Sequence, residues 1–457
     1  MDASLFLNLL STFLYMTNYY IVGPSGPSYV TALGGHSSLH GLLVGATPFA
    51  AMFSALIYSL WTNKSFRYPL LFSGCMLLSG NLLYAVALEF DCIYFLFAGR
   101  FMIGLGGTRG ISRRYIADTV LEEERTRILS YFVACGALGM AAGPAIAVFL
   151  HHYANAIVEI PWFMVDRKNI TFIFNSLTAP GYVMFVAWVF YTCGIMLFFR
   201  EKRRNFHKVQ LKDAESGTTE YSAIIRKTEI GGAERYEYNT INVHERKEAP
   251  PISPTKLHQL KNEITSTIVL YLVLLWINKF IVEEFISSGP IITRDRFGWG
   301  VHKIGTLGAI IGLLVVPISI VVGWLSKKVD DRRLILALFC IAVFGLVIFT
   351  CDPGEFRYVF GYLVVFASLQ ASESVITSSL SKCVSAKLAA GTFNSGLLCT
   401  EFGTAGRVTA NGFLTMAGLL TKTTPNLLIY VVFTPACVLA VTGVMLMKFN
   451  WQEMVRR

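Results

Sequence analysis

A series of long apolar runs constrains this chain more than any other feature. Of its 457 residues, 54% are hydrophobic and only 15% are charged, against roughly 25% charged in ordinary soluble domains. About twelve of the runs have the length that crosses the hydrocarbon core of a membrane as a helix. Lipid offers no partner to backbone polar groups, and the runs are unbroken rather than alternating, so helices are expected instead of a closed barrel. The sequence therefore predicts an all-α integral membrane protein.

The runs fall into two groups of six, separated by a polar stretch. The expected helices cover residues 4–23, 39–61, 68–88, 91–114, 127–151 and 179–200, then 263–288, 302–326, 333–351, 356–380, 391–419 and 425–449. The residues between the groups, 201–262, are rich in charge and cannot bury enough apolar surface to fold alone, so a flexible linker is expected. We therefore expect two six-helix bundles in pseudo-symmetry, residues 1–200 and 263–457, joined by that linker.

Basic residues in the short loops predict the orientation in the membrane. One side carries Lys64, Arg67 and Lys382 together with the linker, whereas the loop from Gly23 to Leu39 has no Lys or Arg. Because short loops rich in Lys and Arg stay in the cytosol, both termini and the linker are expected to be cytosolic. The sequon that begins at Asn169 then falls on the opposite side, where glycosylation can reach it.

Composition and motif content exclude several other classes of protein. The formal charge of +10 lies in residues between the apolar runs, where it sets topology, so no nucleic-acid partner is expected. The chain has no GxxxxGK[ST], no HExxH and no paired-cysteine spacing. We therefore expect no enzyme activity, no cofactor and no metal site.

A charged loop follows the eighth expected helix. It reads Gly323-Trp324-Leu325-Ser326-Lys327-Lys328-Val329-Asp330-Asp331-Arg332-Arg333. Together with the six-plus-six layout, this loop resembles the loop motif of major facilitator transporters, whose halves rock about a site at the midplane. The resemblance implies that Gly323 permits close helix approach and that Asp330, Asp331, Arg332 and Arg333 form a gating latch. The equivalent loop of the first half has Asn63 where an acid is usual in that family.

Two glycine motifs strengthen the resemblance. Arg100-Phe101-Met102-Ile103-Gly104 is similar to the RxxxG motif of that superfamily, and Gly139-Met140-Ala141-Ala142-Gly143-Pro144 is similar to its GxxxGP antiporter motif. Small residues let helices pack closely, and proline perturbs the helix backbone. Because GxxxG is also common in ordinary helix packing, symport and antiport both stay open.

A narrower resemblance covers nearly the whole chain. It rests on the runs Gly99-Arg100, Gly104-Leu105-Gly106, Arg113-Arg114-Tyr115-Ile116, Ala137 to Ala145, Phe297-Gly298-Trp299 and Gly391 to Leu398. These resemble the transporter part of the SPX-MFS family, the plant vacuolar phosphate transporters, whose SPX domain has no counterpart in the printed sequence. The chain also resembles, more distantly, the lysosomal major facilitator protein of neuronal ceroid lipofuscinosis. The resemblance implies transport of phosphate or a similar small anion across a vacuolar or lysosomal-type membrane rather than the plasma membrane.

Charged residues inside the apolar runs give the candidate site. A charge in the hydrocarbon region costs at least about 2.5 kcal/mol, so those that remain usually face a cavity or a partner. Guanidinium groups bind phosphate or carboxylate, and buried carboxylates can carry protons. We therefore expect one set of residues to bind or admit the anion and another to carry the coupling proton. The first set is Arg100, Arg109, Arg113, Asn18, Lys279 and Arg407, and the second is Glu283, Glu373 and Glu401.

Structural pairing is the alternative explanation for the same charges. It pairs Lys279 with Glu283 along one helix, Glu401 with Arg407 or a neighbouring helix, and Arg114 with Asp118.

The sequence thus predicts a monomeric secondary transporter in a lipid bilayer, which carries a small anion, with protons, by alternating access. Three alternatives stay open: a chloride-type anion channel, a transporter of another small solute in such a membrane, and a membrane receptor or scaffold that does not transport.

Overall fold

The computed structural model describes most of the chain outside the central polar stretch. It covers residues 2–120, 122–154, 160–165, 168–201, 228–230, 233–235, 265–326, 328–350, 354–384, 395–421, 424 and 427–452. The chain forms two units, one made of Met1–Arg204 with Ile264–Arg457 and the other of Asn205–Glu263. In the second unit, β3 (Thr228–Ile230) pairs antiparallel with β4 (Ala233–Arg235). The expected linker otherwise lies outside the described residues.

The first half of the large unit contains six spanning segments. They are α1 (Ala3–Tyr20), α3 (Leu39–Trp61), α4 (Arg67–Val86), α5 (Ile93–Leu105) followed by α6 (Arg109–Thr119), α7 (Glu122–Tyr153) and α8 (Ala179–Phe198). A short helix, α2 (Gly26–Ala32), follows α1, and an antiparallel pair, β1 (Ile160–Val165) and β2 (Lys168–Phe172), joins α7 to α8. The sequence predicted neither of these two additions.

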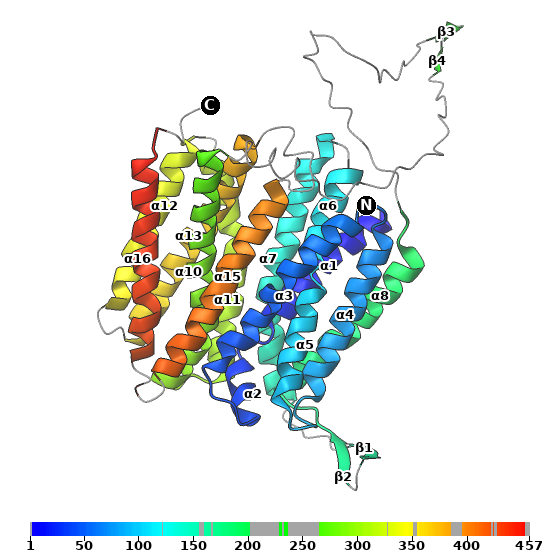
Figure 1. The fold of residues 1–457 in the computed structure, drawn as a ribbon, viewed down its shortest axis with the longest axis vertical. Helices are drawn as coiled ribbons and strands as arrows, with labels where there is room; N and C mark the ends of the chain where they lie inside the picture. The colour runs from blue at the N-terminus through cyan, green and yellow to red at the C-terminus, as the bar shows by residue number, and fades with distance from the viewer. Residues whose placement is uncertain are drawn as a thin grey trace, which may run out of the picture. The chain divides into compact units, whose positions relative to one another are not determined.

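The second half repeats the arrangement. Its segments are α10 (Ser266–Phe297), α11 (Val301–Leu325), α12 (Asp331–Val347) with the 3-10 turn η1 (Ile348–Thr350), α13 (Glu355–Cys383), α15 (Ser395–Leu420) and α16 (Leu428–Phe449). We call the side where α1 begins and α16 ends the termini side, and the side that carries α2 and the β1–β2 pair the loop side (Figure 1). Two six-helix halves thus stand side by side, which confirms the predicted fold.

Seven helices in the described part of the chain are long and apolar enough to cross a membrane by length and composition alone. They are α3, α4, α7, α8, α11, α13 and α16. Of the others, α5 and α12 are 13 and 17 residues long, whereas α1, α10 and α15 are long but carry polar or charged residues. Polar residues of these three helices are buried inside the protein, for example Asn18, Lys279 and Asn411.

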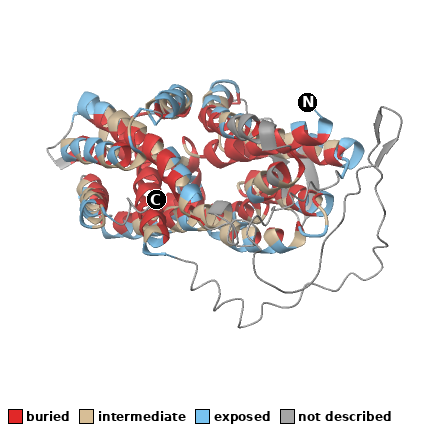
Figure 2. Ribbon diagram, turned by 90° about the horizontal axis from the view of Figure 1, so that it is seen from above, coloured by how far each residue is buried: buried red, intermediate tan, exposed pale blue. Residues whose placement is uncertain are grey.

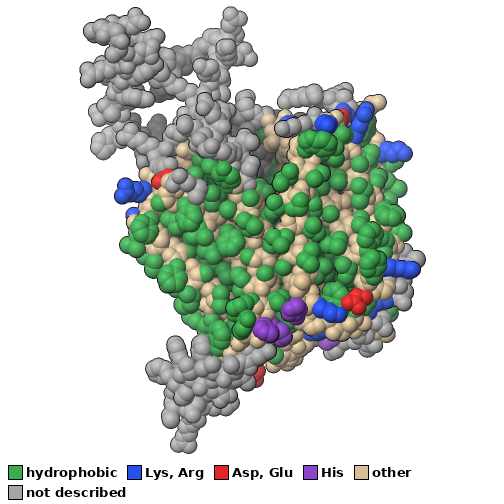
Figure 3. Space-filling view, turned by 180° about the vertical axis from the view of Figure 1, so that it is seen from behind, with side chains coloured by type: hydrophobic (Ala, Val, Ile, Leu, Met, Phe, Trp, Pro, Cys, Tyr) green, Lys and Arg blue, Asp and Glu red, His purple; other side chains and the backbone are tan. Residues whose placement is uncertain are grey.

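Burial follows the pattern of a protein surrounded by lipid. Buried residues lie on the faces that helices turn toward each other, and exposed residues lie on the outer faces (Figure 2). Many of the exposed side chains are large and apolar, for example Phe190, Leu197, Ile320 and Phe356. Hydrophobic side chains cover the middle of the face seen in Figure 3. This apolar outer surface fits the hydrocarbon core.

The helix expected over residues 91–114 is wrong as one continuous helix. It breaks at Gly106-Gly107-Thr108, between α5 and α6. At Gly106 a Cβ would stand 2.9 Å from the carbonyl oxygen of Ser73, so only glycine fits here without a shift. The Ser73 hydroxyl donates to the Gly106 carbonyl at 2.7 Å, which satisfies a backbone group released by the break. In the second half, α10 runs on to Phe297 and ends at Gly298, whose φ is 65°.

The glycine motifs confirm the expectation of close helix packing. A Cβ on Gly104 would lie 2.1 Å from the Thr47 carbonyl oxygen of α3. On α7, a Cβ on Gly139 would lie 2.4 Å from the Phe13 carbonyl oxygen, and one on Gly143 would lie 2.8 Å from the Ile21 nitrogen. The helices therefore touch backbone to backbone at these positions.

Glycines also bring the two halves together. Near the loop side, a Cβ on Gly41 of α3 would lie 2.8 Å from the Asn411 carbonyl oxygen of α15. Deeper in the unit, a Cβ on Gly312 of α11 would lie 2.5 Å from the Ala141 nitrogen of α7. The halves therefore meet through the pairs α3 with α15 and α7 with α11.

Candidate functional site

Arg100 donates hydrogen bonds to the C-terminal end of α1. Its side chain on α5 is fully buried, and its guanidinium donates to the carbonyl oxygens of Asn18 at 3.2 Å and Tyr19 at 3.4 Å. The last carbonyls of a helix have no partner within the helix and carry a partial negative charge, so a cation is well placed there. The Nε of Arg100 and the side-chain amide nitrogen of Asn18 have no hydrogen-bond partner among the described residues.

Glu283 of α10 joins three helices. Its Oε1 accepts from the Tyr19 hydroxyl of α1 at 2.5 Å, from the Asn411 amide of α15 at 3.2 Å and from the Ser287 hydroxyl at 3.4 Å. The Nε of Arg407 lies 3.7 Å from its Oε2. The carboxylate, almost inaccessible to solvent, is therefore compensated by one guanidinium and three donors. Of these contacts, the bond from Tyr19 links the first half to the second.

Lys279 pairs with a different carboxylate. Its Nζ lies 2.5 Å from Oε2 of Glu373 on α13, and the Gln370 amide donates to the same oxygen at 3.0 Å. The proposed pairing of Lys279 with Glu283 along α10 is therefore wrong, as is a pairing of Glu401 with Arg407. The reason is geometric, because α13 and α15 pack against α10 and bring closer partners than those on the same helix.

Arg109 and Arg113 lie on α6, nearer the termini side than Glu283. Arg113 donates to the Thr400 hydroxyl of α15 at 3.0 Å and so reaches across to the second half. Both guanidinium carbons stand over the Phe132 ring, at 5.8 Å for Arg109 and 5.5 Å for Arg113. Neither these two arginines nor Arg100 has an ion-pair partner among the described residues.

We call these residues the interface cluster: Arg100, Arg109, Arg113, Lys279, Arg407, Glu283 and Glu373. Its five cations and two anions leave an excess of three positive charges, 5 − 2 = 3. Arg109 is close enough to Arg113 and Arg407 to be repelled by both. Glu401 on α15 has a buried Oε1 with no partner among the described residues, and counting it as ionised still leaves 5 − 3 = 2. The cluster thus carries positive charge without a counterion among the described residues, and an anion could bind there.

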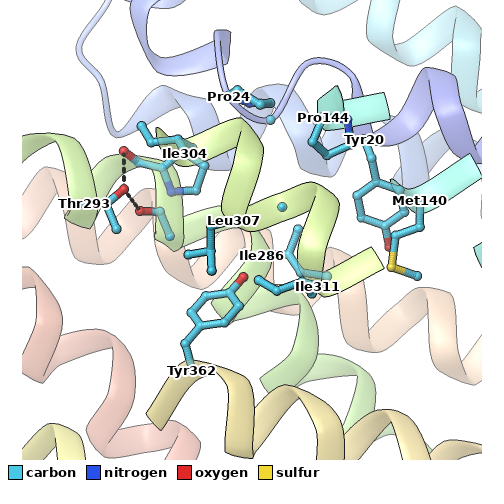
Figure 4. A pocket seen from close by; sticks show the side chains of 14 residues that line it. Tyr20, Pro24, Met140, Pro144, Ile286, Thr293, Ile304, Leu307, Ile311 and Tyr362 are labelled. Carbon is cyan, nitrogen blue, oxygen red and sulfur yellow. Dashed lines mark hydrogen bonds between the residues drawn. The ribbon is translucent and has the colours of Figure 1, made fainter. Parts of the chain in front are cut away.

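A cavity lies on the loop side of the cluster, between α1, α7, α10, α11 and α13. Its lining is mostly apolar and includes Met140, Ile286, Leu307 and Ile311, with Tyr20, Thr293 and Tyr362 as the larger polar side chains (Figure 4). The Thr293 hydroxyl is already bonded to the Gly289 carbonyl of its own helix at 2.6 Å. The cavity therefore offers few polar groups of its own.

Comparison with known proteins places this fold. A sequence model described as Major Facilitator Superfamily matches residues 9–400. The chain belongs to the major facilitator superfamily. An SPX domain-containing membrane protein of Arabidopsis thaliana is 32% identical over 469 residues, which covers 99% of this chain and 64% of that protein. One from Oryza sativa subsp. japonica is 33% identical over 459 residues, with 96% and 63% covered. The chain thus spans less than two thirds of the length of these relatives.

Solved structures show the same fold at low identity. A bacterial homologue of the human lysosomal transporter Spinster, in an inward-facing and occupied conformation, matches with a TM-score of 0.69 and 11% identity, covering 98% of this chain and 96% of that one. A D-xylose–proton symporter matches with a TM-score of 0.61 and 11% identity, with 96% of each chain covered. Both similarities concern the fold alone.

The charged loop from Gly323 to Arg333 of this major facilitator protein makes contacts on the termini side. Asp331 lies 2.7 Å from the Lys382 ammonium at the end of α13, while Asp330 pairs with Arg332 and caps α12. Arg332 also stands over the Trp451 ring, at 5.3 Å. A Cβ on Gly323 would meet nothing within 4 Å in this conformation, and its expected role in close helix approach stays a prediction. Arg333 is near enough to Asp330 to attract its carboxylate as well.

The corresponding position of the first half uses a neutral residue. Arg114 donates to the Asn63 side chain, to the Ser59 carbonyl at 2.5 Å and to the Thr62 hydroxyl at 3.1 Å, and it pairs with Asp118 at 3.5 Å. The predicted pair of Arg114 with Asp118 is confirmed. Asn63 thus accepts a hydrogen bond from Arg114, where an acidic residue would form an ion pair with that arginine.

Sequence reasoning missed the roles of several polar residues in the superfamily fold. Tyr19 gave no distinct signal, because tyrosines are common at the ends of membrane-spanning helices, although its hydroxyl binds Glu283. Asn411 and Gln370 gave no signal because single amides in apolar runs have no fixed spacing. For Asn169, the backbone lies in β2 and the side chain lies outside the described residues.

Proposed function

We propose that this chain is a secondary transporter of inorganic phosphate or a similar small anion. The observation that carries the proposal is the positive excess of the interface cluster, which draws cations from both halves. An anion there would act as the counterion that the cluster lacks, and guanidinium forks suit phosphate oxygens. Curated relatives named as SPX domain-containing membrane proteins support the assignment.

Transport would follow the alternating access of the two halves. Most of the anion-binding candidates lie where the halves meet, as expected for this type of protein. Glu401 is the proton carrier best supported among those expected from the sequence, because Glu283 and Glu373 are ion-paired whereas the described residues give Glu401 no such partner. We place the termini and the linker in the cytosol and the chain in a vacuolar or lysosomal-type membrane.

The test is uptake of radiolabelled phosphate into proteoliposomes that contain the purified protein, with and without a pH gradient. The informative variant is Arg113→Gln, which removes a charge of the cluster without breaking an ion pair. A lost charge-assisted contact worth about 1.5–3 kcal/mol should raise the half-saturating phosphate concentration about 10- to 150-fold. Arg357→Gln is the matched control, because Arg357 is exposed at the loop-side end of α13.

The outcomes separate the alternatives. Wild-type uptake that Arg113→Gln weakens and Arg357→Gln leaves unchanged would support the anion site. A folded wild-type protein that moves no phosphate would refute the substrate, and chloride, sulfate and organic anions would be tested next. Currents larger than a carrier can turn over would indicate a channel instead.

A further inference from the structure

Helix α10 carries two Glu–Ser pairs in adjacent register, within the sequence Glu283-Glu284-Phe285-Ile286-Ser287-Ser288. Residues four apart lie on the same face of a helix, so Glu283 shares a face of α10 with Ser287, and Glu284 shares the next face with Ser288. The first pair belongs to the interface cluster, where Ser287 donates to Glu283 at 3.4 Å. The second pair lies on the neighbouring face.

Glu284 and Ser288 have no partner of any kind in the described part of the chain. Both residues are fully buried, and neither oxygen of the Glu284 carboxyl nor the Ser288 hydroxyl has a hydrogen-bond partner there. None of the ion pairs among the described residues includes Glu284, so no counterion there compensates its carboxyl. This contrasts with Glu283, whose charge is compensated by Arg407.

A carboxylate in such surroundings is too costly to remain ionised. Removing it from water without a hydrogen bond or counterion disfavours the charged form far more than the neutral one. The carboxyl of Glu284 therefore holds a proton in this conformation. The ionised Glu283 and the neutral Glu284 are neighbours in the chain but lie in different environments.

The helix has a hinge close to this carboxyl. Gly289 and Pro290 follow Ser288 directly, and Pro290 lies inside α10. Proline has no backbone N–H, so the Ile286 carbonyl lacks its helical partner and the helix bends easily there. Both residues also line the cavity between the halves. Bending at this point would change what Glu284 faces.

We propose that Glu284 is a proton-binding site of the transporter. Its carboxyl holds a proton in this conformation and releases that proton when α10 bends at Gly289-Pro290. The proposal rests on the proposed transport function and deepens it, because it adds a coupling group that the sequence did not indicate. Its ligand is the proton itself, and Ser288 is the nearest hydroxyl on the same helix face.

Infrared difference spectroscopy of the protein in liposomes tests the proton directly, without any substrate. Wild type should show the carbonyl band of a protonated carboxyl that shifts when H₂O is exchanged for D₂O. Glu284→Gln should lose this band, whereas the control Glu355→Gln, at an exposed acid, should keep it. A band that keeps its full wild-type intensity in Glu284→Gln, or a wild-type protein without a band that shifts in D₂O, would overturn the proposal, whereas a smaller band that remains is assigned to Glu401 if Glu401→Gln removes it.

A second variant covers the case in which Glu284→Gln does not fold. Glu284→Asp keeps the carboxyl but withdraws it by one methylene, so the band should remain at a changed frequency. An identical band in Glu284→Asp and wild type would overturn the assignment.

Flux measurements separate this proposal from the proposed function. In proteoliposomes, Glu284→Gln should still exchange internal for external phosphate but lose the stimulation by a pH gradient. If it keeps the wild-type stimulation, Glu284 is not a coupling group, although phosphate transport stands. If wild type moves no phosphate, the substrate is wrong, and the infrared result still decides whether Glu284 binds the proton.

Discussion

Replacement of Gly41 by alanine should shift the protein toward a state that is open on the loop side. The added Cβ would lie 2.8 Å from the Asn411 carbonyl oxygen and 3.1 Å from the Thr415 nitrogen. Both are backbone atoms of α15, so the contact remains even if the Thr415 hydroxyl, 2.6 Å from the Cβ, turns aside. An ordinary contact begins near 3.4 Å, so α3 and α15 must separate by about 0.6 Å, and overpacking of this kind costs about 1–3 kcal/mol. That cost falls on the conformation in which the halves touch here, which should raise the population of the opposite state about 5- to 150-fold.

Labelling of a cysteine in the cavity measures this shift. Thr293 is buried and lines the cavity, so Thr293→Cys, in a chain without its native cysteines, should react faster with a water-soluble maleimide when the loop side opens. The matched control is Gly412→Ala, on α15 beside Asn411, where a Cβ would meet nothing within 4 Å. Equal labelling rates with and without Gly41→Ala, or an equal acceleration by Gly412→Ala, would refute the role of the glycine contact.

Three further predictions concern stability, read as the midpoint of unfolding in mild detergent. Glu283→Gln should lower the free energy of unfolding by about 3–5 kcal/mol, because it leaves the buried charge of Arg407 uncompensated. Adding Arg407→Gln should restore part of that loss, whereas additive losses in the double variant would contradict the pairing. Tyr19→Phe should cost about 1.5–3 kcal/mol by removing a hydrogen bond to a carboxylate, and an unchanged midpoint would argue against that bond. Hydrogen bonding from Arg332 lowers the pKa of Asp330, so this pair should add stability above the pKa of Asp330 in the unfolded chain and lose it as the pH falls through the folded pKa. Asp330→Asn should remove that part of the acid dependence, and an unaltered pH profile would exclude the contribution.

The fold could be predicted because lipid restricts the choices. Apolar runs of membrane-spanning length must become helices, and their grouping gives the two halves. The break at Gly106-Gly107-Thr108 was not predictable, because glycines also occur inside continuous packed helices. Only the approach of Ser73 from α4 shows that these residues leave the helix. In the same way, the extension of α10 to Phe297 depends on Gly298 in a left-handed conformation, which composition does not reveal.

The sequence located the residues of the candidate site but did not predict which of them pair with each other. Charges within apolar runs are rare and costly, which singled out residues such as Lys279, Glu373 and Arg407. Their partners could not be assigned, because spacing along one helix describes only neighbours on that helix. The actual partner of Lys279 comes from α13, and that of Glu283 comes from α15 with a hydroxyl from α1. Packing between helices thus determines these ion pairs, and spacing along one helix suggested the wrong partners.

The distribution of these contacts between the halves bears on how the protein can move. Both ion pairs of the interface cluster lie within the second half, because Lys279, Glu283, Glu373 and Arg407 all belong to it. Arg100 binds carbonyls of α1 within the first half.

Far fewer contacts of the cluster cross between the halves. Among the described residues, they are the hydrogen bonds of Tyr19 with Glu283 and of Arg113 with Thr400, together with the Arg407 guanidinium over the Tyr19 ring. Breaking a buried ion pair by separating its partners would expose an uncompensated charge at a cost of several kcal/mol. Rocking of the halves avoids that cost, since it parts one contact of a guanidinium with a ring and two hydrogen bonds, whose groups water or an entering anion can satisfy in turn. The cluster is therefore built so that both of its ion pairs stay intact within the second half while the surface between the halves opens.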